Sequence, residues 1–311
     1  MNPRREWLVL LAVWAALLLW FGSSSAYFFS TASLSSLANR LPALAMVSAG
    51  MTLVMVTGGI DLSVGSLLGL CGVVCGLVMT QAGWTLLPAM ALALLVGAGA
   101  ATLTGALAAW FSLPSFIVSL GMLEVARGAA FWLSESRTQY IGASIEGLAR
   151  PWPGLGFSPA LMLAAGAVWV SHVLLRQHRL GRQWVAVGAN AQAARLSGLD
   201  LHRPRILAHA ILGALTGLAA VVHASRLGSA DPNAGVGFEL SVIAAVVVGG
   251  TSLNGGRGQV LQSLLGVLII ATVEAGLAQQ GVSEPAKRVI TGLVIVAAVL
   301  AQRWRASPTS P

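Results

Sequence analysis

Two glycine-rich stretches hold the residues of this sequence that are most suited to chemistry or to movement. Residues 57–66 read Thr-Gly-Gly-Ile-Asp-Leu-Ser-Val-Gly-Ser, and residues 248–258 read Val-Gly-Gly-Thr-Ser-Leu-Asn-Gly-Gly-Arg-Gly. A phosphate-binding P-loop needs Gly-Lys followed by Ser or Thr, but the only lysine of the chain, Lys287, follows Ala286. Neither stretch opens a βαβ unit, as a dinucleotide fingerprint would. The sequence therefore excludes nucleotide binding by either device.

Three carboxylates lie beside or within long apolar runs, namely Asp61, Glu124 and Glu274. An unpaired carboxylate at membrane depth is a functional candidate by default. Glu124 and Arg127 are three residues apart, so we expect them to pair on one helix. Glu274 has no partner nearby in the sequence, and it is either such a candidate or a residue at the wet end of its helix.

No catalytic or metal-binding cluster is visible, so we expect neither a cofactor nor enzymatic activity. The five histidines are scattered singly. Cys71 and Cys75 are too few for zinc, which takes four ligands, and we expect them to be packing residues.

The composition requires a bilayer around the elements that position these residues. Of the 311 residues, 56% are hydrophobic and only 9% are charged, and the mean hydropathy is +0.81. Soluble domains are about 25% charged. The net charge of +8 would suit nucleic acid, but the basic residues lie between apolar runs, as in cytoplasmic loops. We therefore predict an all-α, polytopic membrane protein, in contact with lipid and without a nucleic-acid partner.

The spacing of charges predicts ten membrane helices within one domain, residues 1–311, each about 20 apolar residues long. The expected spans are residues 7–22, 41–57, 62–81, 86–110, 113–133, 158–175, 206–225, 239–250, 258–280 and 286–303. Basic residues favour the side of the amino terminus, which places both termini in the cytoplasm. The first span also fits a cleavable signal peptide, but we favour a retained anchor.

Residues 176–205 form the one long polar stretch, which we expect to be a cytoplasmic loop. Asn190 can cap a short helix that runs to Leu196 and is stopped by Gly198. The alternative is a solvated connector whose arginines only fix the topology. We favour a docking helix, because a connector needs no capped, alanine-rich turn.

The two glycine-rich stretches share the pattern Gly-Gly, any residue, Asp or Ser, Leu, two residues, Gly. Repeated breaks of this kind are typical of internally duplicated transporters, in which they line the substrate path. Our assignment makes the two repeats parallel. The alternative is a pair of tight turns at the membrane surface, with Asp61 and Arg257 in water. The candidate pathway and hinge residues are Gly58, Gly59, Asp61, Ser63, Gly65, Gly249, Gly250, Ser252 and Asn254.

Four stretches together resemble the permease subunits of ribose-type sugar ABC importers, a group that also serves xylose, arabinose, galactose, rhamnose and autoinducer-2. Residues 58–66 are similar to the hallmark of this family. Residues 116–121 with Arg127 and Gly128 resemble its fifth-helix pattern, residues 187–198 its cytoplasmic coupling segment, and residues 249–258 its second glycine loop. The likeness spans nearly the whole chain in the same order.

The resemblance implies a non-catalytic permease subunit of the bacterial inner membrane that translocates a monosaccharide or a related small polar solute. The implied partners are a cytoplasmic ABC ATPase, a periplasmic sugar-binding protein and a second permease chain, either identical or a paralogue. The residues implied to couple to the ATPase are Gly188, Asn190, Ala194, Arg195, Leu196 and Gly198. Two rival hypotheses are an ion-coupled secondary transporter that uses Asp61, Glu124 or Glu274, and a membrane-embedded transferase or protease.

Overall fold

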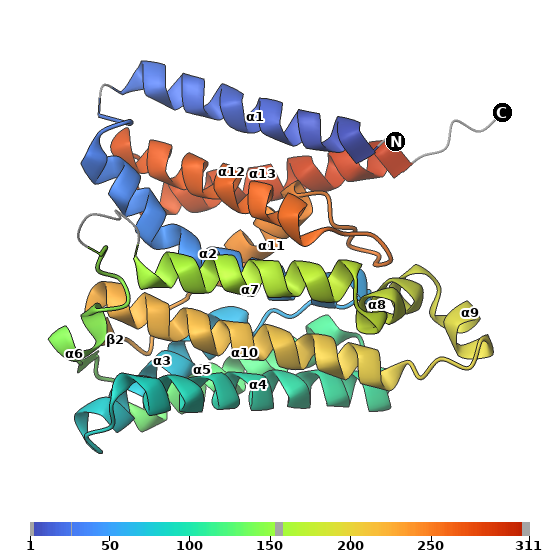
Figure 1. Cartoon of the computed structure of the whole chain (residues 1–311), viewed down its shortest axis with the longest axis horizontal. Coiled ribbons are helices and arrows are strands. Elements are labelled where there is room, and N and C mark those ends of the chain that lie inside the picture. The colour runs from blue at the N-terminus through green and yellow to red at the C-terminus, as the bar shows by residue number, and fades with distance from the viewer. Residues whose placement is uncertain (1–2, 26, 153–157, 307–311) are drawn as a thin grey trace.

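The computed structural model describes residues 3–25, 27–152 and 158–306, which are helical almost throughout (Figure 1). The helices are α1 (Pro3–Ser24), α2 (Thr31–Val56), α3 (Val64–Thr80), α4 (Leu86–Trp110), α5 (Ser115–Leu133), α6 (Ala143–Glu146), α7 (Pro159–Arg176), α8 (Arg179–Ala189), α9 (Ala191–Leu196), α10 (His202–Leu227), α11 (Phe238–Val248), α12 (Val260–Gln279) and α13 (Glu284–Ala306). The sheet found in these residues is one antiparallel pair, β1 (Gln139–Tyr140) with β2 (Ser229–Ala230). The all-α prediction is confirmed.

Within the described residues, seven helices are long and apolar enough to cross a membrane, namely α1, α2, α4, α5, α7, α10 and α12. Two further apolar helices, α3 and α11, have only 17 and 11 residues. Each of the ten expected spans coincides with one of these nine helices or with α13. The polytopic character predicted from the composition is thus confirmed.

One expected boundary is wrong, because α2 begins at Thr31 rather than at residue 41. Ser30 caps the helix, and its hydroxyl accepts a hydrogen bond from the amide of Ser33 at 3.3 Å. Arg40 lies inside α2 and is exposed. A charged residue therefore does not end this helix, since its side chain reaches out of the packed surface.

Helices α4 and α10 pack with their backbones in contact. A methyl group on Gly97 of α4 would overlap the carbonyl oxygen of Gly213 on α10, and one on Gly217 would overlap that of Ala93. Small residues at helix interfaces permit this approach in membranes, where dispersion contacts drive association. The pair holds α10 in place beside the first glycine-rich stretch.

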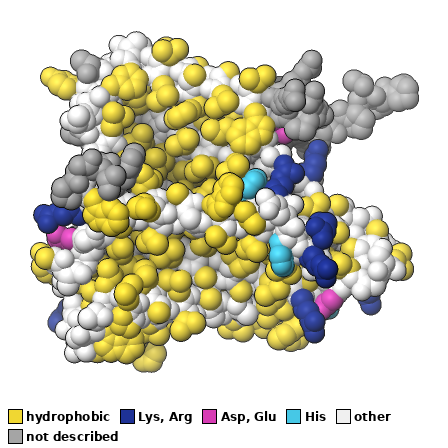
Figure 2. Space-filling model, in the orientation of Figure 1, with side chains coloured by type: hydrophobic (Ala, Val, Ile, Leu, Met, Phe, Trp, Pro, Cys, Tyr) yellow, Lys and Arg dark blue, Asp and Glu magenta, His cyan; other side chains and the backbone are white. Residues whose placement is uncertain are grey.

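The molecule has two distinct ends (Figure 1). The short helices α8 and α9 form one end, and α6 with the β1–β2 pair lies at the other. Helix α1 begins at the α8–α9 end, where Gln262 donates to Glu6 at 3.4 Å, and α13 ends there too. On the face shown in Figure 2, Lys and Arg side chains gather over α8 and α9, while apolar side chains cover the middle.

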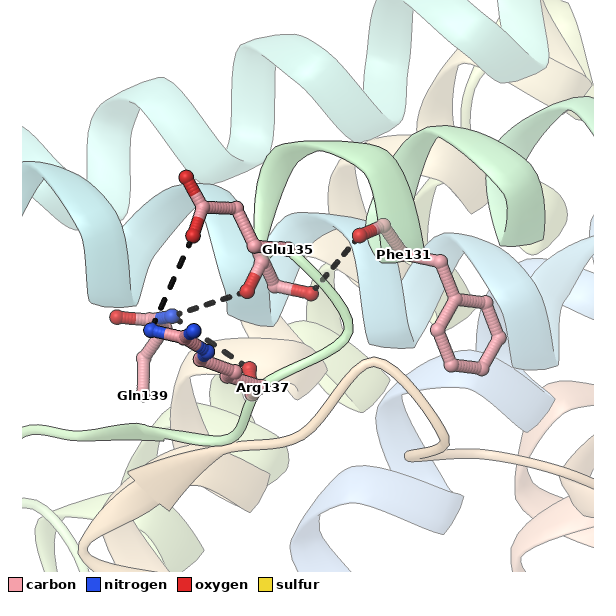
Figure 3. A network of polar contacts seen from close by, with 5 residues as sticks. Phe131, Glu135, Arg137 and Gln139 are labelled. Atoms are coloured by element: carbon pink, nitrogen blue, oxygen red, sulfur yellow. Dashed lines mark hydrogen bonds and ion pairs between the residues drawn. The ribbon is translucent and has the colours of Figure 1, made fainter.

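At the opposite end, α5 passes into β1 through a tight polar turn (Figure 3). Glu135 and Ser136 adopt φ values of 52° and 60°, and the amide of Ser136 donates to the carbonyl of Phe131 at 2.8 Å. Arg137 lies 3.9 Å from the carboxylate of Glu135, and both side chains are exposed. The exposed pair adds little to stability, so the local hydrogen bonds hold the turn.

We predict that Gly97→Ala destabilises the protein while Gly99→Ala on the same helix does not. Both substitutions favour the helix, but only the methyl on Gly97 meets α10, whereas nothing lies within 4 Å of the one on Gly99. Overpacking of this kind costs about 1–3 kcal/mol. Thermal unfolding in detergent measures the difference, and equal midpoints for the two variants would contradict the close packing of α4 on α10.

Candidate functional site

The first glycine-rich stretch breaks the chain between α2 and α3. Helix α2 ends at Val56, and Gly58 follows with φ +83°, a value that glycine adopts without strain. The extended residues that follow are bound by two hydroxyls of α5. Ser115 Oγ accepts from the amide of Ile60 at 2.9 Å and donates to its carbonyl at 3.0 Å, and Ser119 Oγ accepts from the amide of Leu62 at 2.9 Å.

Asp61 is fully buried within this break. Its Oδ1 accepts from the amide of Ser63 at 2.8 Å and from the hydroxyl of Ser63 at 2.6 Å, while Oδ2 has no hydrogen-bond partner among the described residues. The alternative that Asp61 lies in water is therefore wrong. Asp61 and Ser63 shape the turn into α3, and Asp61 is absent from the lining of the cavity described below.

Gly65 lies in α3 and provides close contact with the loop that precedes α11. A methyl group there would overlap the carbonyl oxygen of Gly235 and the carboxylate of Glu239. Arg127 of α5 fixes the same loop, since its guanidinium donates to the carbonyls of Pro232 and, at 2.9 Å, of Ala234. The expected Glu124–Arg127 ion pair is not found among the described residues: the guanidinium donates to these carbonyls, and the exposed Glu124 attracts it less than Glu239 and Asp231 do.

The second glycine-rich stretch turns the chain from α11 into α12. Gly249 packs on α12, where a methyl group would lie 2.5 Å from the carbonyl oxygen of Gln262, and Gly250 follows with φ +90°. Ser252 donates its amide to the carbonyl of Arg257 at 2.9 Å and accepts at its hydroxyl from the amide of Asn254 at 3.2 Å. Asn254 and Arg257 are exposed, as the surface-turn alternative expects.

The two breaks and the end of α8 meet backbone to backbone, an arrangement that we call the glycine junction (residues 56–58, 188–189 and 255–256). The amide of Gly256 donates to the carbonyl of Val56 at 2.9 Å. A methyl group on Gly188 would overlap that same carbonyl, and one on Gly255 would lie 2.8 Å from the Cα of Gly58. A displacement of α8 must therefore also shift the backbone of both breaks.

Helices α8 and α9 form the surface beyond this junction. Trp184 is fully buried, and its indole nitrogen donates to the carbonyl of Pro204 at 2.8 Å, which anchors α8 to α10. The predicted cap of α9 is confirmed, because Asn190 Oδ1 accepts from the amide of Ala193 at 2.9 Å. The helix ends at Leu196, and Gly198 follows with φ +80°.

The two faces of α9 differ. Ala194 is buried against the body of the protein, whereas Arg195 and Leu196 project outward, and Leu196 is 83% exposed. A large apolar side chain with this exposure at the tip of a basic helix is available to a protein partner.

The three carboxylates proposed for an ion-coupled transporter do not come together. Asp61 lies inside the first break, Glu124 is exposed on α5, and Glu274 on α12 accepts from the hydroxyl of Ser241 at 3.0 Å. Glu274 thus has a partner that the sequence did not reveal, because Ser241 is on another helix. No group of three or more metal-ligating side chains occurs in the part of the chain that the structure describes.

A cavity of about 300 Å³ lies beside the first break. Its wall is formed by Thr57, Gly58 and Gly59, by the turn between α4 and α5, and by Arg205 and His209 of α10. From the sequence, His209 is expected only to be a packing or lumen-facing polar group, and Arg205 a residue of the cytoplasmic loop, because only the packing of α10 on α4 brings the two to the break. Ser115 and Ser119 were missed too, although their spacing of four places them on one helical face.

The chain matches, over residues 33–299, the family described as the permease component of the branched-chain amino acid transport system. It belongs to this family of permease components. The ribose import permease protein RbsC of Escherichia coli (strain K12) is 36% identical over 277 residues, which cover 88% of this chain and 86% of the relative.

Two further relatives carry different names. The D-allose transport system permease protein AlsC of Escherichia coli (strain K12) is 34% identical over 91% of this chain and 87% of its own length. The autoinducer 2 import system permease protein LsrC of Salmonella typhi is 33% identical over 94% of this chain and 84% of its own length. No solved structure matches the chain.

We predict that Gly188→Ala opens the glycine junction of this permease component. The added methyl would overlap Val56 O and lie 2.6 Å from the amide nitrogen of Gly256, so the Gly256–Val56 hydrogen bond must lengthen or break. Hydrogen exchange at residues 255–258 should rise relative to the wild type. Gly166→Ala, where nothing lies within 4 Å of the new methyl, is the matched control. Unchanged exchange in Gly188→Ala would contradict the junction.

Proposed function

We propose that this chain is the membrane-spanning permease subunit of an ATP-driven importer for a monosaccharide or a similar small polar solute. The observation that carries the proposal is the glycine junction, in which the end of α8 contacts both helix breaks of a chain from a permease family. The chain itself hydrolyses no nucleotide, because it contains no P-loop. The energy must therefore arrive from another subunit through α8 and α9.

The proposed topology has ten crossings, with both termini and the α8–α9 end in the cytoplasm. Helix α11 spans only about 17 Å at 1.5 Å per residue, too little for a core of about 30 Å. The loop before it completes the crossing, and Arg127 binds the carbonyls of this loop. The excess of arginine around α8 and α9 supports the orientation.

The proposed mechanism starts where α9 docks on a cytoplasmic ATPase through Arg195 and Leu196. Nucleotide binding can drive the permease only if the ATPase holds α9 differently in the inward-open and outward-open states. Because Trp184 and the glycine junction fix α8 to the body, a shift of α9 moves Val56 and Gly256 together. The breaks then change the opening between α2, α3, α11 and α12, with Gly58, Gly59, Gly249 and Gly250 as hinges.

The partners that complete the importer are an ATPase, a periplasmic sugar-binding protein and a second permease chain. The names of the relatives support a sugar rather than an amino acid, since they specify ribose, allose and autoinducer 2. The family description names branched-chain amino acids. The likeness to the named relatives covers most of each chain, so we give it more weight than the description of the whole family.

We predict that replacing both Arg195 and Leu196 with Asp abolishes ATP-driven uptake. The two exposed side chains leave the fold unaffected, while two new negative charges oppose docking on the surface that normally receives an arginine. Membrane insertion and recovery of the ATPase with the tagged permease are measured together with uptake. Arg137→Asp, exposed at the opposite end, is the control for charge reversal and should retain the ATPase. Normal uptake by the double variant would refute docking through α9.

We predict that cells expressing the complete importer accumulate labelled ribose or allose, and that labelled leucine is not taken up. A strain that lacks its own sugar and amino-acid importers provides the background. Its uptake without the permease gives the baseline. Uptake of leucine alone would overturn the proposed substrate class and leave the permease role in place. Uptake that collapses with an ionophore while ATP persists would overturn the ATP-driven mechanism.

A further inference from the structure

The cavity beside the first break contains a positive charge without a counter-ion. Arg205 is half-buried in its wall, and its guanidinium makes no hydrogen bond or ion pair with any residue that the structure describes. Its neighbour Arg203 is exposed and pairs with Asp200 at 3.4 Å. A partly buried charge is costly unless it is paired, so the environment of Arg205 is suited to an anion.

His209 adds a second unpaired polar atom to the same cavity. It lies one helical turn after Arg205 and is only 2% exposed. Its Nδ1 is 2.9 Å from the carbonyl oxygen of Arg205, which can only accept, so Nδ1 carries the proton. Nε2 is buried and has no partner among the described residues. It can therefore accept from a hydroxyl or, when protonated, donate to an oxyanion.

The first turn of α5 contributes a third feature. Ser115 lines the cavity at the start of this 19-residue helix. The first amides of a helix carry a partial positive charge, which favours anions. In α5 the amides of Ile117 and Val118 already donate to the carbonyl of Pro114, which leaves those of Ser115 and Phe116 for a ligand. A neutral sugar would leave the charge of Arg205 uncompensated, whereas an oxyanion compensates it and also accepts from these amides.

Exposed aromatic residues beside the cavity indicate its depth in the membrane. Trp110 and Phe111, at the end of α4 beside the cavity, are 65% and 67% exposed. Exposed aromatic residues gather at the level of lipid headgroups. An oxyanion at this depth and at the cytoplasmic end comes either from a lipid or from the cytoplasm.

We propose that this cavity binds a phosphate group, held by Arg205, by His209 Nε2 and by the first turn of α5. The group belongs to the headgroup of an anionic phospholipid or to a small soluble phosphate such as a sugar phosphate. The P–OH of a phosphate monoester can donate to Nε2 while its anionic oxygens contact Arg205. A phospholipid diester has no P–OH, so a hydroxyl of its headgroup would donate to Nε2 instead. Because Gly58 and Gly59 line the same cavity, an occupant would touch the first hinge of the permease.

The test measures binding to the full-length chain in nanodiscs of zwitterionic lipid and in detergent. In nanodiscs, inorganic phosphate and ribose 5-phosphate are titrated and followed by phosphorus NMR. In detergent, added phosphatidylglycerol is counted by native mass spectrometry. We expect the wild type to bind in one of these arms, which identifies the source. Arg205→Gln should weaken that binding about tenfold or more, since it loses a charge-assisted interaction.

Two variants keep the test decisive. Arg203→Gln removes a neighbouring arginine that already has a partner, and it should bind as the wild type does. Gly105→Ala leaves every charge in place, but its methyl would lie 2.8 Å from the Cβ of His209 and must displace the ring from its position in the cavity wall, so it should also lose binding.

Three results would overturn the proposal: absence of binding in both arms at millimolar probe, equal binding by Arg205→Gln and the wild type, or equal losses in Arg203→Gln and Arg205→Gln. Because no uptake is measured, the outcome is independent of the proposed transport function.

Discussion

Irregular backbone inside a bilayer must find hydrogen-bond partners within the protein, and this requirement governs the structure. Lipid offers no donors or acceptors, so each unpaired amide or carbonyl there costs several kcal/mol, on the order of a lost hydrogen bond or more. In the proposed topology, the first break and the loop before α11 are segments of this kind. One helix, α5, satisfies both through Ser115, Ser119 and Arg127.

The spacing of these three residues explains how a single helix does this. Residues 115, 119 and 127 are separated by four and eight positions, so they lie along one face of α5. The extended residues 60–62 lie at the start of this face, and the carbonyls of residues 232 and 234 lie two turns further along it. Gly65 and Gly69 of α3 leave the space through which the loop reaches Arg127. These contacts hold the short helices α3 and α11, which the proposed topology places at membrane depth, against α5.

The same requirement accounts for the glycine junction. Where α8 meets the two breaks, side chains are replaced by backbone contacts, and the amide of Gly256 is satisfied by Val56. Backbone contacts transmit displacement better than flexible side chains do, because they have no rotamers to absorb it. In the proposed mechanism, a displacement of α9 therefore has a short and stiff path to the two breaks.

Local signals were sufficient to predict the helices, the positions of the breaks and the cap of α9. The Asn190 cap depends only on neighbours in the chain, as does the interruption by Gly58 and Gly59. One failure is local, because the Ser30 cap that starts α2 was overlooked. The other failures depend on distant residues. Arg127 binds a loop more than one hundred positions away instead of Glu124, and Glu274 finds Ser241 on another helix. The cavity of Arg205 and His209 exists only because Gly97, Gly213 and Gly217 bring α4 against α10.

The shared pattern of the two breaks can be accounted for by packing, whether or not the chain is duplicated. Both breaks reverse the chain at the α8–α9 end, and both place glycine backbone against the same junction. The order of long and short helices differs between the two breaks. At the first break the longer helix comes before the break (α2 with 26 residues, then α3 with 17), and at the second the longer helix comes after it (α11 with 11 residues, then α12 with 20). A simple parallel repeat would keep the same order of long and short helices. Each glycine of the two pairs has its own local reason: Gly58 lies at the junction, Gly249 packs against the backbone of α12, and Gly58 and Gly250 adopt positive φ values.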